Sequence, residues 1–422
     1  MIACIEALNY RCLRYIHQEL DSFQVLVGPN ASGKSTLLDA VAFLGQFLSD
    51  GPVKAVRDRA PDVESLFWMR QGDRFEMALE LTIPQERRDR LPSNSYERAR
   101  YEIAVGFNPE REIAILGENL WLKPREPPGH PNDKRRQLRL FPEPMAPPGA
   151  LVIQEGKHSP RGWRRVVSKR SDAANDYFQA ETTGWNNPFR LGPQKPALAN
   201  LPEDEERFPV ATWVKRVLLE GIQALVLNSQ SMRRPAPPGS PVEFQHDGSN
   251  LPWAIEHFTK TDPEGFERWV DHLRTALPDL QAVDTVERPE DRHRYLRLTY
   301  AGGLSVPSWV VSDGTLRLMA LTLVAYLPPA ERVYLIEEPE NGIHPTAVET
   351  VFQSLSSAYE AQILCASHSP VVLSLAEPDQ LLCFAKTPEG ATDIVRGSEH
   401  PLLREWKRET DLGTLFASGV LG

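Results

Sequence analysis

The sequence is poor in cysteine and has no long hydrophobic run. Only four of its 422 residues are cysteines, and none forms a C-x-x-C pair, which argues against a disulfide framework or a cysteine-ligated zinc site. Their apolar, strand-like neighbours predict buried free thiols in a reducing cytoplasm. The longest apolar run, ALTLVAYL, is far shorter than the roughly 20 residues that cross a bilayer. The first ten residues contain neither a basic nor a long apolar segment, so we expect no signal peptide, no membrane association and a cytoplasmic location.

Internal repeats and heptads are also missing, which excludes a repeat array and a long coiled coil. A chain of 422 residues is too long for one simple core, so we expect a composite domain or two to three lobes. Hydrophobic residues make up 41% and charged residues 25%, which is ordinary for a globular protein.

Hydrophobic spacing predicts both strands and helices, and hence an α/β fold. The expected strands cover residues 2–8, 13–20, 23–27, 75–83, 100–107, 112–122, 293–300, 332–336 and 362–366. The expected helices cover residues 37–48, 211–227, 252–258, 263–277, 315–327 and 345–358. Residues 150–210 give no clear pattern.

The clearest motif is GPNASGKS, residues 28–35, which matches G-x-x-x-x-G-K-[ST] between a predicted strand and a predicted helix. In such a loop, backbone N–H groups and the helix N-terminus hold phosphate oxygens. Lys34 would reach the β- and γ-phosphates as a catalytic residue, and the Ser35 hydroxyl would bind Mg²⁺. The residues predicted to bind ATP here are Gly28, Pro29, Asn30, Ala31, Ser32, Gly33, Lys34, Ser35 and Thr36.

Two adjacent carboxylates, Glu337 and Glu338, directly follow the strand predicted over residues 332–336. Such a pair is costly unless positive charge lies beside it, and a P-loop supplies that charge through its lysine and its metal ion. A P-loop site also needs an acid at the end of a second parallel strand. We therefore predict that Glu337 holds Mg²⁺ and that Glu338 is the catalytic base that activates the attacking water.

Two further motifs follow in order. In VVSDGTLR, Ser312 stands where a helix is expected to begin, which predicts an N-cap and, with Gly314, an anion-binding turn. This stretch looks like the signature loop of ABC-type ATPases. In SHSP, His368 follows a predicted strand, 30 residues beyond Glu338, and looks like the switch histidine that contacts the γ-phosphate.

In this order, the P-loop, the signature, the acidic strand end, EPENGIHP and SHSP resemble the ABC-type ATPase heads of the RecF, SMC and OLD group. More closely, the chain resembles stand-alone RecF-like predicted ATPases of the AAA family, which accompany OLD-type nucleases and anti-phage or toxin–antitoxin modules. The resemblance implies a two-lobed head around a mixed β-sheet. It predicts lobes over residues 1–122 and 218–422, with a basic, proline-rich insertion over residues 123–217.

The resemblance also implies partners. Two copies would form a homodimer around two ATP molecules, with each P-loop facing the partner's signature, and residues 339–342 would link the two sites. The dimer would be an ATP-hydrolysing switch or sensor that controls a separately encoded effector, such as a toprim-type nuclease or a toxin, in phage defence. Tyr10 or Arg11 would lie near the adenine.

Some residues depart from the family pattern. The acid that holds the metal is Glu337, where the family usually has Asp, and its extra methylene changes the Mg²⁺ geometry. A nucleotide-bound scaffold with little hydrolysis therefore stays open as an alternative. The glutamine that completes the Mg²⁺ shell is not identifiable, and Gln154 and Gln194 are the candidates. The signature reads S-D-G-T rather than S-G-G-Q, and we expect Asp313 to point away from the partner's phosphates.

The net charge is −10, yet residues 123–170 hold twelve Lys and Arg against four Asp and Glu. The runs KRRQLR and RGWRRVVSKR favour contact with double-stranded DNA or another nucleic acid, with Trp163 stacking on an unpaired base. A partner-protein surface and a solvated loop are the alternatives, and eight prolines within residues 124–148 favour a loop or linker there.

Other function classes fit less well. A transporter subunit would be more compact than the 277 residues that separate Ser35 from Ser312. About fifty residues follow His368, too few for an added toprim nuclease domain. A RecF-like DNA-repair or DNA-clamp ATPase remains the main alternative to the switch.

Overall fold

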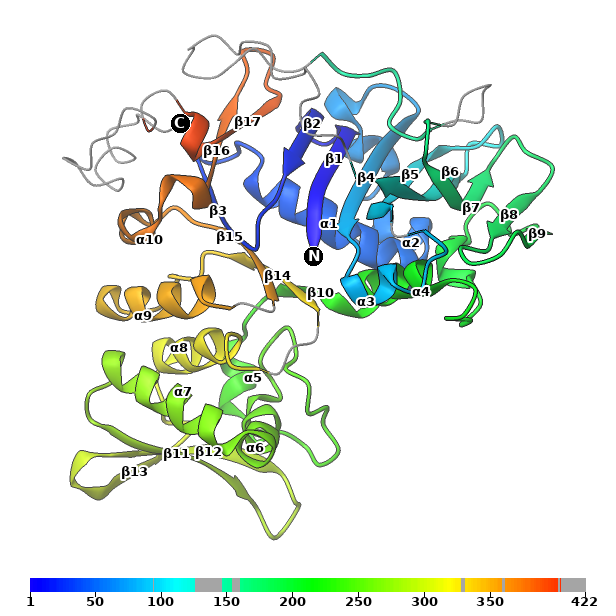
Figure 1. The fold of residues 1–422 in the computed structure, drawn as a ribbon. Coiled ribbons are helices and arrows are strands. Elements are labelled where there is room, and N and C mark those ends of the chain that lie inside the picture. The colour runs from blue at the N-terminus through cyan, green and yellow to red at the C-terminus, as the bar shows by residue number, and fades with distance from the viewer. Residues whose placement is uncertain are drawn as a thin grey trace.

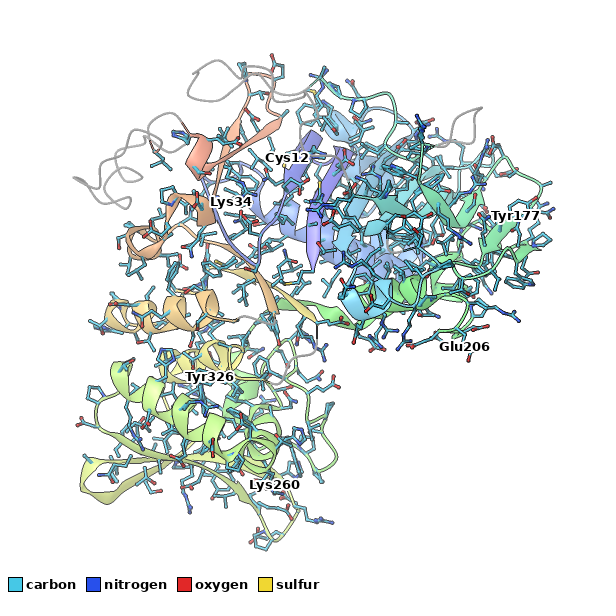
Figure 2. All side chains as sticks on the ribbon, viewed as in Figure 1. Cys12, Lys34, Tyr177, Glu206, Lys260 and Tyr326 are labelled. Carbon is cyan, nitrogen blue, oxygen red and sulfur yellow. The ribbon has the colours of Figure 1, made fainter. Side chains whose placement is uncertain are left out.

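The chain folds into two lobes around three β-sheets, A, B and C (Figure 1). The computed structural model describes residues 1–93, 95–125, 146–153, 160–327, 331–358, 361–400 and 403. Figure 2 shows Lys34 in the upper lobe and Lys260 and Tyr326 in the lower lobe. Within the described ranges, no helix is long and apolar enough to cross a membrane.

Sheet B is the central sheet of the fold. Its strands, in spatial order, are β10 (Ile222–Leu225), β14 (Arg332–Glu337), β15 (Ala361–Ala366), β3 (Phe23–Val27), β16 (Leu381–Lys386) and β17 (Thr392–Arg396). The first five run parallel, and β17 pairs antiparallel with β16. Leu26 packs into one hydrophobic core with α1 (Lys34–Asp50), whereas Val25 and Val27 pack into a second core with α9 (Pro345–Ser356). Both faces are buried, which explains why FQVLV is continuously apolar.

Sheet A forms the outer part of the upper lobe. Its strands, in spatial order, are β2 (Leu13–Glu19), β1 (Ile2–Tyr10), β4 (Arg74–Thr82), β5 (Tyr96–Phe107), β6 (Ile113–Pro124), β7 (Arg164–Arg170), β8 (Asp176–Gln179) and β9 (Asn186–Phe189). All neighbouring pairs are antiparallel. The described part of residues 123–217 therefore extends sheet A by three strands. Val166 and Val167 of β7 are fully buried in its core.

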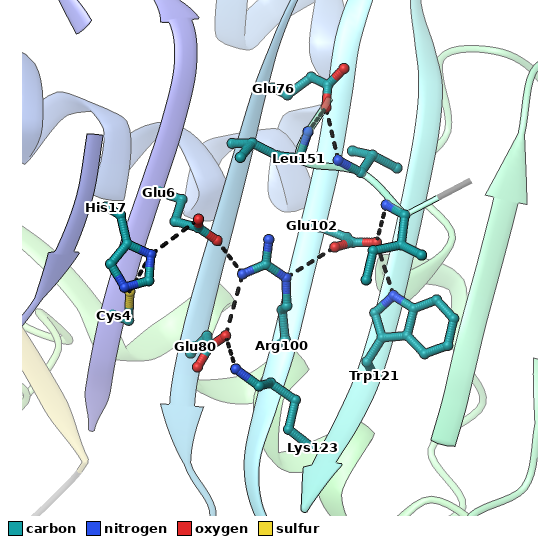
Figure 3. A network of polar contacts seen from close by, with 12 residues as sticks. Cys4, Glu6, His17, Glu76, Glu80, Arg100, Glu102, Trp121, Lys123 and Leu151 are labelled. Atoms are coloured by element: carbon teal, nitrogen blue, oxygen red, sulfur yellow. Dashed lines mark hydrogen bonds and ion pairs between the residues drawn. The ribbon is translucent and has the colours of Figure 1, made fainter. Parts of the chain in front are cut away.

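A buried network of charges crosses one face of sheet A (Figure 3). The Arg100 guanidinium pairs with Glu6, with Glu80 at 3.3 Å and with Glu102 at 3.1 Å. The Lys123 ammonium adds an ion pair with Glu80 at 2.5 Å. Burial of these charges is tolerable because each is paired, and removing one partner would leave another uncompensated. The network ties β1, β4, β5 and β6 together.

The lower lobe contains sheet C and the helices α5 (Ser229–Arg233), α6 (Leu251–Thr261), α7 (Pro263–Ala276) and α8 (Asp313–Leu323) (Figure 1). Sheet C is antiparallel and consists of β11 (Leu280–Glu287), β12 (Arg294–Tyr300) and β13 (Leu304–Pro307). The other helices of the chain are α2 (Pro52–Arg57), α3 (Gln85–Arg88), α4 (Pro209–Arg216) and α10 (Pro370–Leu375). Proline stands at the first or second position of α2, α4, α6, α7 and α10, where its missing N–H is not needed.

The prediction of one helix over residues 211–227 is wrong. The α-helix ends at Arg216, a single π-helical turn covers Val217–Gly221, and strand β10 follows. Residues 222–225 pair in parallel with Val333–Ile336 of β14. This tertiary pairing overrides the local helical spacing, which cannot distinguish a short buried strand from a helix end.

Glu181 supports the N-terminus of α4 from a fully buried position. Its carboxylate accepts the backbone N–H groups of Val210 and Ala211, both at 2.7 Å. Burial raises the pKa of Glu181 to about 7, against the opposing effect of the two N–H groups and of Arg164. Between about pH 4.5 and 7, the folded state therefore holds a proton that the unfolded state has released.

We predict that Glu181→Gln removes this pH dependence. Relative to the variant, the wild-type chain should lose free energy of unfolding as pH rises from about 4.5 to 7, by at most about 3 kcal/mol, with no further loss above pH 7. Urea unfolding of both proteins across this range measures the difference, with the exposed Glu206→Gln as the control variant. A difference that stays constant with pH would contradict the prediction.

Candidate nucleotide-binding site

The carboxyl ends of the parallel strands of sheet B bring three sequence motifs to one edge. The register aligns Leu26, Ala366 and Glu337 across β3, β15 and β14. Beyond this row of residues, β3 is followed by the P-loop, β15 by the SHSP motif and β14 by Glu338. Ligands of open parallel sheets bind at this edge.

The two outer glycines of the P-loop are required by its conformation and by close packing. Their φ angles are +146° at Gly28 and +110° at Gly33, which side-chain-bearing residues rarely adopt. A Cβ atom on Gly28 would lie 2.3 Å from the Phe384 carbonyl oxygen, and one on Gly33 would lie 2.2 Å from Thr392 Oγ1. The Thr392 hydroxyl also donates a hydrogen bond to the Ser32 carbonyl at 2.8 Å. The hairpin β16–β17 therefore braces the loop.

Lys34 begins α1 with a buried side chain. Its ammonium donates hydrogen bonds to the carbonyl oxygens of Gly28 and Pro29, both at 2.8 Å. Burial lowers the pKa of Lys34 to about 8, and the carboxylates of Glu337 and Glu338 oppose that shift. Lys34 is thus a buried cation beside Glu337 and Glu338. It supplies the positive charge that two adjacent carboxylates need.

Ser35 and Glu337 meet directly. The Ser35 hydroxyl donates a hydrogen bond to Glu337 Oε2 at 2.8 Å, although 302 residues separate the two in the chain. Both side chains are exposed at the edge of the sheet. Hydroxyl and carboxylate oxygens suit Mg²⁺, and neighbouring ligands of an octahedral Mg²⁺ lie about 2.9 Å apart. The pair therefore fits the predicted metal site.

Glu338 adopts a strained backbone conformation with φ 48°. Its N–H donates a hydrogen bond to the Ala366 carbonyl at 2.8 Å, which ties the end of β14 to β15. Its exposed carboxylate accepts a long hydrogen bond from the Asn341 side chain at 3.5 Å. Positive φ at a residue other than glycine is uncommon and costly, and it persists only where the surroundings fix it.

The SHSP segment is held by Glu340. The Ser367 hydroxyl donates to Glu340 Oε1 at 2.7 Å, and the His368 backbone N–H donates to the same oxygen at 3.3 Å. Ser367 is fully buried, whereas His368 is half-buried. The structure thus places the predicted switch histidine at the same edge as the P-loop.

Ser312 caps α8, as the sequence predicts. Its hydroxyl accepts the N–H of Thr315 at 3.2 Å. The Asp313 carboxylate pairs with Arg233 at 2.8 Å, so its negative charge is offset locally. Gly314 packs against residues 339–342: an added Cβ would lie 2.6 Å from the Gly342 carbonyl oxygen. Within the described residues, no hydrogen bond or ion pair joins the signature to the P-loop of the same chain.

Two secondary expectations are not met as stated. Tyr10 is fully buried and donates a hydrogen bond to Asp39 at 2.6 Å, so it cannot contact an adenine. Arg11 is partly exposed and pairs with Asp39 at 2.9 Å, and its place near the adenine stays a prediction. The Gln194 carbonyl oxygen lies 3.0 Å from a Cβ placed on Gly51, just beyond the last residue of α1. A helix of 17 residues is about 25 Å long, which puts Gln194 far from the P-loop. Gln154 lies outside the described residues.

A polar segment that the sequence analysis missed follows β10. Because β10 pairs in parallel with β14, residues beyond Leu225 continue to the edge that carries Glu337. Asn228 uses its side chain to cap α5. Gln230 is the first glutamine at this edge, and its side chain is exposed. It is the candidate for the glutamine that would complete the Mg²⁺ shell. Recognising Ile222–Leu225 as a strand would have found it.

The basic run over residues 161–170 is largely built into the sheet. Lys169 is buried, and its ammonium contacts Asp176 at 3.4 Å. The Arg165 guanidinium lies 5.6 Å from the centre of the Trp121 ring. Trp163 packs edge-on against Trp121 with ring centres 6.2 Å apart, and Lys123 lies 4.8 Å from the Trp163 ring centre. These contacts stabilise β7 and do not favour stacking of Trp163 on a base. The run KRRQLR lies outside the described residues.

Comparisons with known proteins agree with this architecture. A family model described as "AAA domain, putative AbiEii toxin, Type IV TA system" matches residues 23–374. An SMC head bound to the C-winged helix domain of ScpA superposes with a TM-score of 0.53 at 15% identity, over 93% of this chain and 97% of that chain. An SMC head from Pyrococcus furiosus with an extended coiled coil, bound to the C-terminal domain of ScpA, gives a TM-score of 0.49 at 13% identity, over 93% and 95%. No curated protein matches the sequence.

The likeness to the first SMC head confirms the predicted fold class, a mixed α/β fold like that of an SMC head. The family match spans well over half of the chain and includes the P-loop, the signature, both carboxylates and the SHSP motif. The predicted resemblance is therefore confirmed, and the chain belongs to the family of AAA domains of the AbiEii-toxin type, associated with type IV toxin–antitoxin systems.

Proposed function

We propose that the chain binds and hydrolyses ATP with Mg²⁺ as a homodimer, and that its nucleotide state switches a partner effector. The observation that carries this proposal is the hydrogen bond between Ser35 and Glu337, at 2.8 Å. It joins the P-loop to an acidic strand end in the combination that phosphoryl transfer requires. Membership of an AAA-domain family supports the ATPase class.

The P-loop residues bind the phosphates. Backbone N–H groups at the start of α1 face this edge, and Lys34 supplies a positive charge beside them. With a pKa of about 8, Lys34 is mostly charged at neutral pH, and phosphate oxygens would strengthen that charge. Ser35 and Glu337 would hold Mg²⁺, which when bound neutralises phosphate charge.

Glu338 would act as the general base. Its carboxylate would accept a proton from water while the water oxygen bonds to the γ-phosphorus and the β–γ bridging bond breaks, releasing ADP and phosphate. The hydrogen bond from the Glu338 N–H to Ala366 fixes the start of this side chain. His368, at the end of the neighbouring strand, would contact the γ-phosphate.

The position of the signature supports a dimer. Ser312 and Gly314 lie at the N-terminus of α8, an anion-binding feature, but they serve no phosphate site within the described part of their own chain. Gly314 instead contacts Gly342 of the segment that follows the acidic strand end. A second copy would bring this helix end to the first copy's P-loop.

For the effector, we propose a class of protein. The family description names a toxin–antitoxin system, and an SMC head of the same fold is bound to a domain of the protein ScpA. We propose that the ATP-bound dimer engages a separately encoded nuclease or toxin in such a system or in phage defence.

We predict that Lys34→Ala weakens ATP binding at least about 100-fold, because removing one partner of a buried charge pair costs several kcal/mol. Isothermal titration with ATP and Mg²⁺ measures the affinity. Lys54→Ala, on the exposed face of α2, is the matched control and should bind like the wild type. Equal affinities for all three proteins would refute the P-loop assignment.

We predict that Glu338→Gln keeps ATP binding but lowers turnover about 100- to 10,000-fold, the range that a general base contributes. The amide cannot accept the proton, so the variant should accumulate as an ATP-bound dimer. Phosphate release and size-exclusion chromatography with ATP measure the two effects. The exposed Glu349→Gln on α9 is the control. Wild-type turnover in Glu338→Gln would remove Glu338 from this role.

A mixing experiment tests the shared site. Ser312→Asp keeps an N-cap residue for α8 but places a negative charge where the partner's phosphates would bind. We predict that this variant and Lys34→Ala are each inactive alone. Mixed in equal amounts, they should recover about a quarter of wild-type turnover, because half of the dimers are mixed and each of these has one intact site. No recovery, in a mixture shown to exchange subunits, would contradict the dimer.

A further inference from the structure

Glu340 holds the backbone that carries the switch histidine. Its Oε1 atom accepts the Ser367 hydroxyl at 2.7 Å and the His368 N–H at 3.3 Å. The Ser367 oxygen in turn accepts the N–H of Ser369 at 3.0 Å. One carboxylate oxygen thus fixes three consecutive residues, directly or through one hydroxyl.

Both ends of this connection are anchored. On one side, Ser367 N–H donates to the Leu26 carbonyl at 3.1 Å, at the point where β3 enters the P-loop. On the other side, the Glu340 carbonyl accepts the N–H of Ile343 at 3.1 Å, which closes a turn. Gly342 in the same turn packs against the first residues of α8. The Glu340 carboxylate therefore connects a turn whose backbone is held in place with the end of β15, which is also held in place.

The second carboxylate oxygen, Glu340 Oε2, is buried, and it has no hydrogen-bond partner in the described part of the chain. A buried acceptor without a partner costs on the order of 1–3 kcal/mol. Glu340 therefore carries a cost in stability at this position, and such a group in a native structure calls for an explanation.

We propose that Glu340 is a positioning residue, which sets the location of the His368 imidazole by holding Ser367 and the His368 N–H. It performs no chemistry itself. The inference rests on the proposed function, in which His368 contacts the γ-phosphate of ATP.

The first test needs no nucleotide. In a chain with labelled histidines, the ring resonances of His368 are identified by their loss in His368→Ala. They should shift in Glu340→Ala and stay in place in the control Glu349→Ala. In Glu340→Gln the His368 resonances should lie close to their wild-type positions, because the amide oxygen can still accept a hydrogen bond from the Ser367 hydroxyl. Unshifted His368 resonances in Glu340→Ala would overturn the inference, whether or not the chain hydrolyses ATP.

The second test is kinetic. Glu340→Ala should lower kcat about 10- to 100-fold, the loss expected from a small misplacement of a catalytic group, with ADP affinity unchanged. Added to His368→Ala, it should cause no further loss, because both changes remove the same contact. Losses that multiply in the double variant, or wild-type turnover in Glu340→Ala, would overturn the inference.

Ser367→Ala provides a second route if Glu340→Ala does not fold. It removes the hydroxyl from the other side of the contact and should reproduce both the shifted His368 resonances and the lower kcat. A wild-type chain without ATP turnover would defeat the proposed function, while the resonance measurement would still decide the role of Glu340.

Discussion

The candidate site depends on the parallel pairing of β3 between β15 and β16. These strands come from opposite ends of the chain, yet their register aligns Leu26 with Ala366, and Ala366 with Glu337. Only this alignment brings Ser35 within 2.8 Å of Glu337 across 302 residues of sequence. The two hydrophobic cores on either face of sheet B stabilise the pairing, so folding of the whole head is what assembles the site.

Two residues of the candidate site other than glycine have a strained backbone. Gly28 and Gly33 adopt conformations that glycine tolerates, but Ala31 and Glu338 have φ angles of 60° and 48° without that freedom. Such residues persist only where the surroundings fix them. At Glu338 the fixing contact is the hydrogen bond to Ala366, and at the P-loop it is the packing of Thr392 and Phe384. The backbone of the site is therefore held by specific contacts, while the side chains of Glu337 and Glu338 are exposed.

The motifs could be predicted from sequence because they depend on local chemistry. A loop that wraps phosphate needs glycine, lysine and a hydroxyl at fixed spacing. The capping role of Ser312 is likewise local, because its partner is only three residues away. The strand that follows α4 could not be predicted in this way. Residues 222–225 have helical spacing with their neighbours and become a strand only by pairing with β14. The candidate glutamine, Gln230, could not be predicted for the same reason, since its place at this edge depends on that strand.

Contacts between distant side chains were the second limit. Nothing local indicates that Lys169, inside a run of basic residues, is buried beside Asp176. The run looks like a nucleic-acid surface because charge is visible in sequence and burial is not. Glu340 is the converse case. It stands in a recognisable motif, but its link to Ser367, 27 residues away, follows only from the adjacency of β14 and β15.

The charges around the signature explain how its unusual aspartate can be tolerated. In the proposed dimer, this helix end would face the partner's phosphates, and a free carboxylate at the first turn of α8 would oppose their binding. Arg233 of α5 pairs with Asp313 at 2.8 Å, and the same guanidinium donates hydrogen bonds to the Val311 carbonyl. The arginine thus holds the acidic side chain beside the loop, leaving the Ser312 hydroxyl and the Gly314 backbone at the helix end. The departure from the usual signature is compensated by a residue 80 positions earlier, in the helix that follows the overlooked strand.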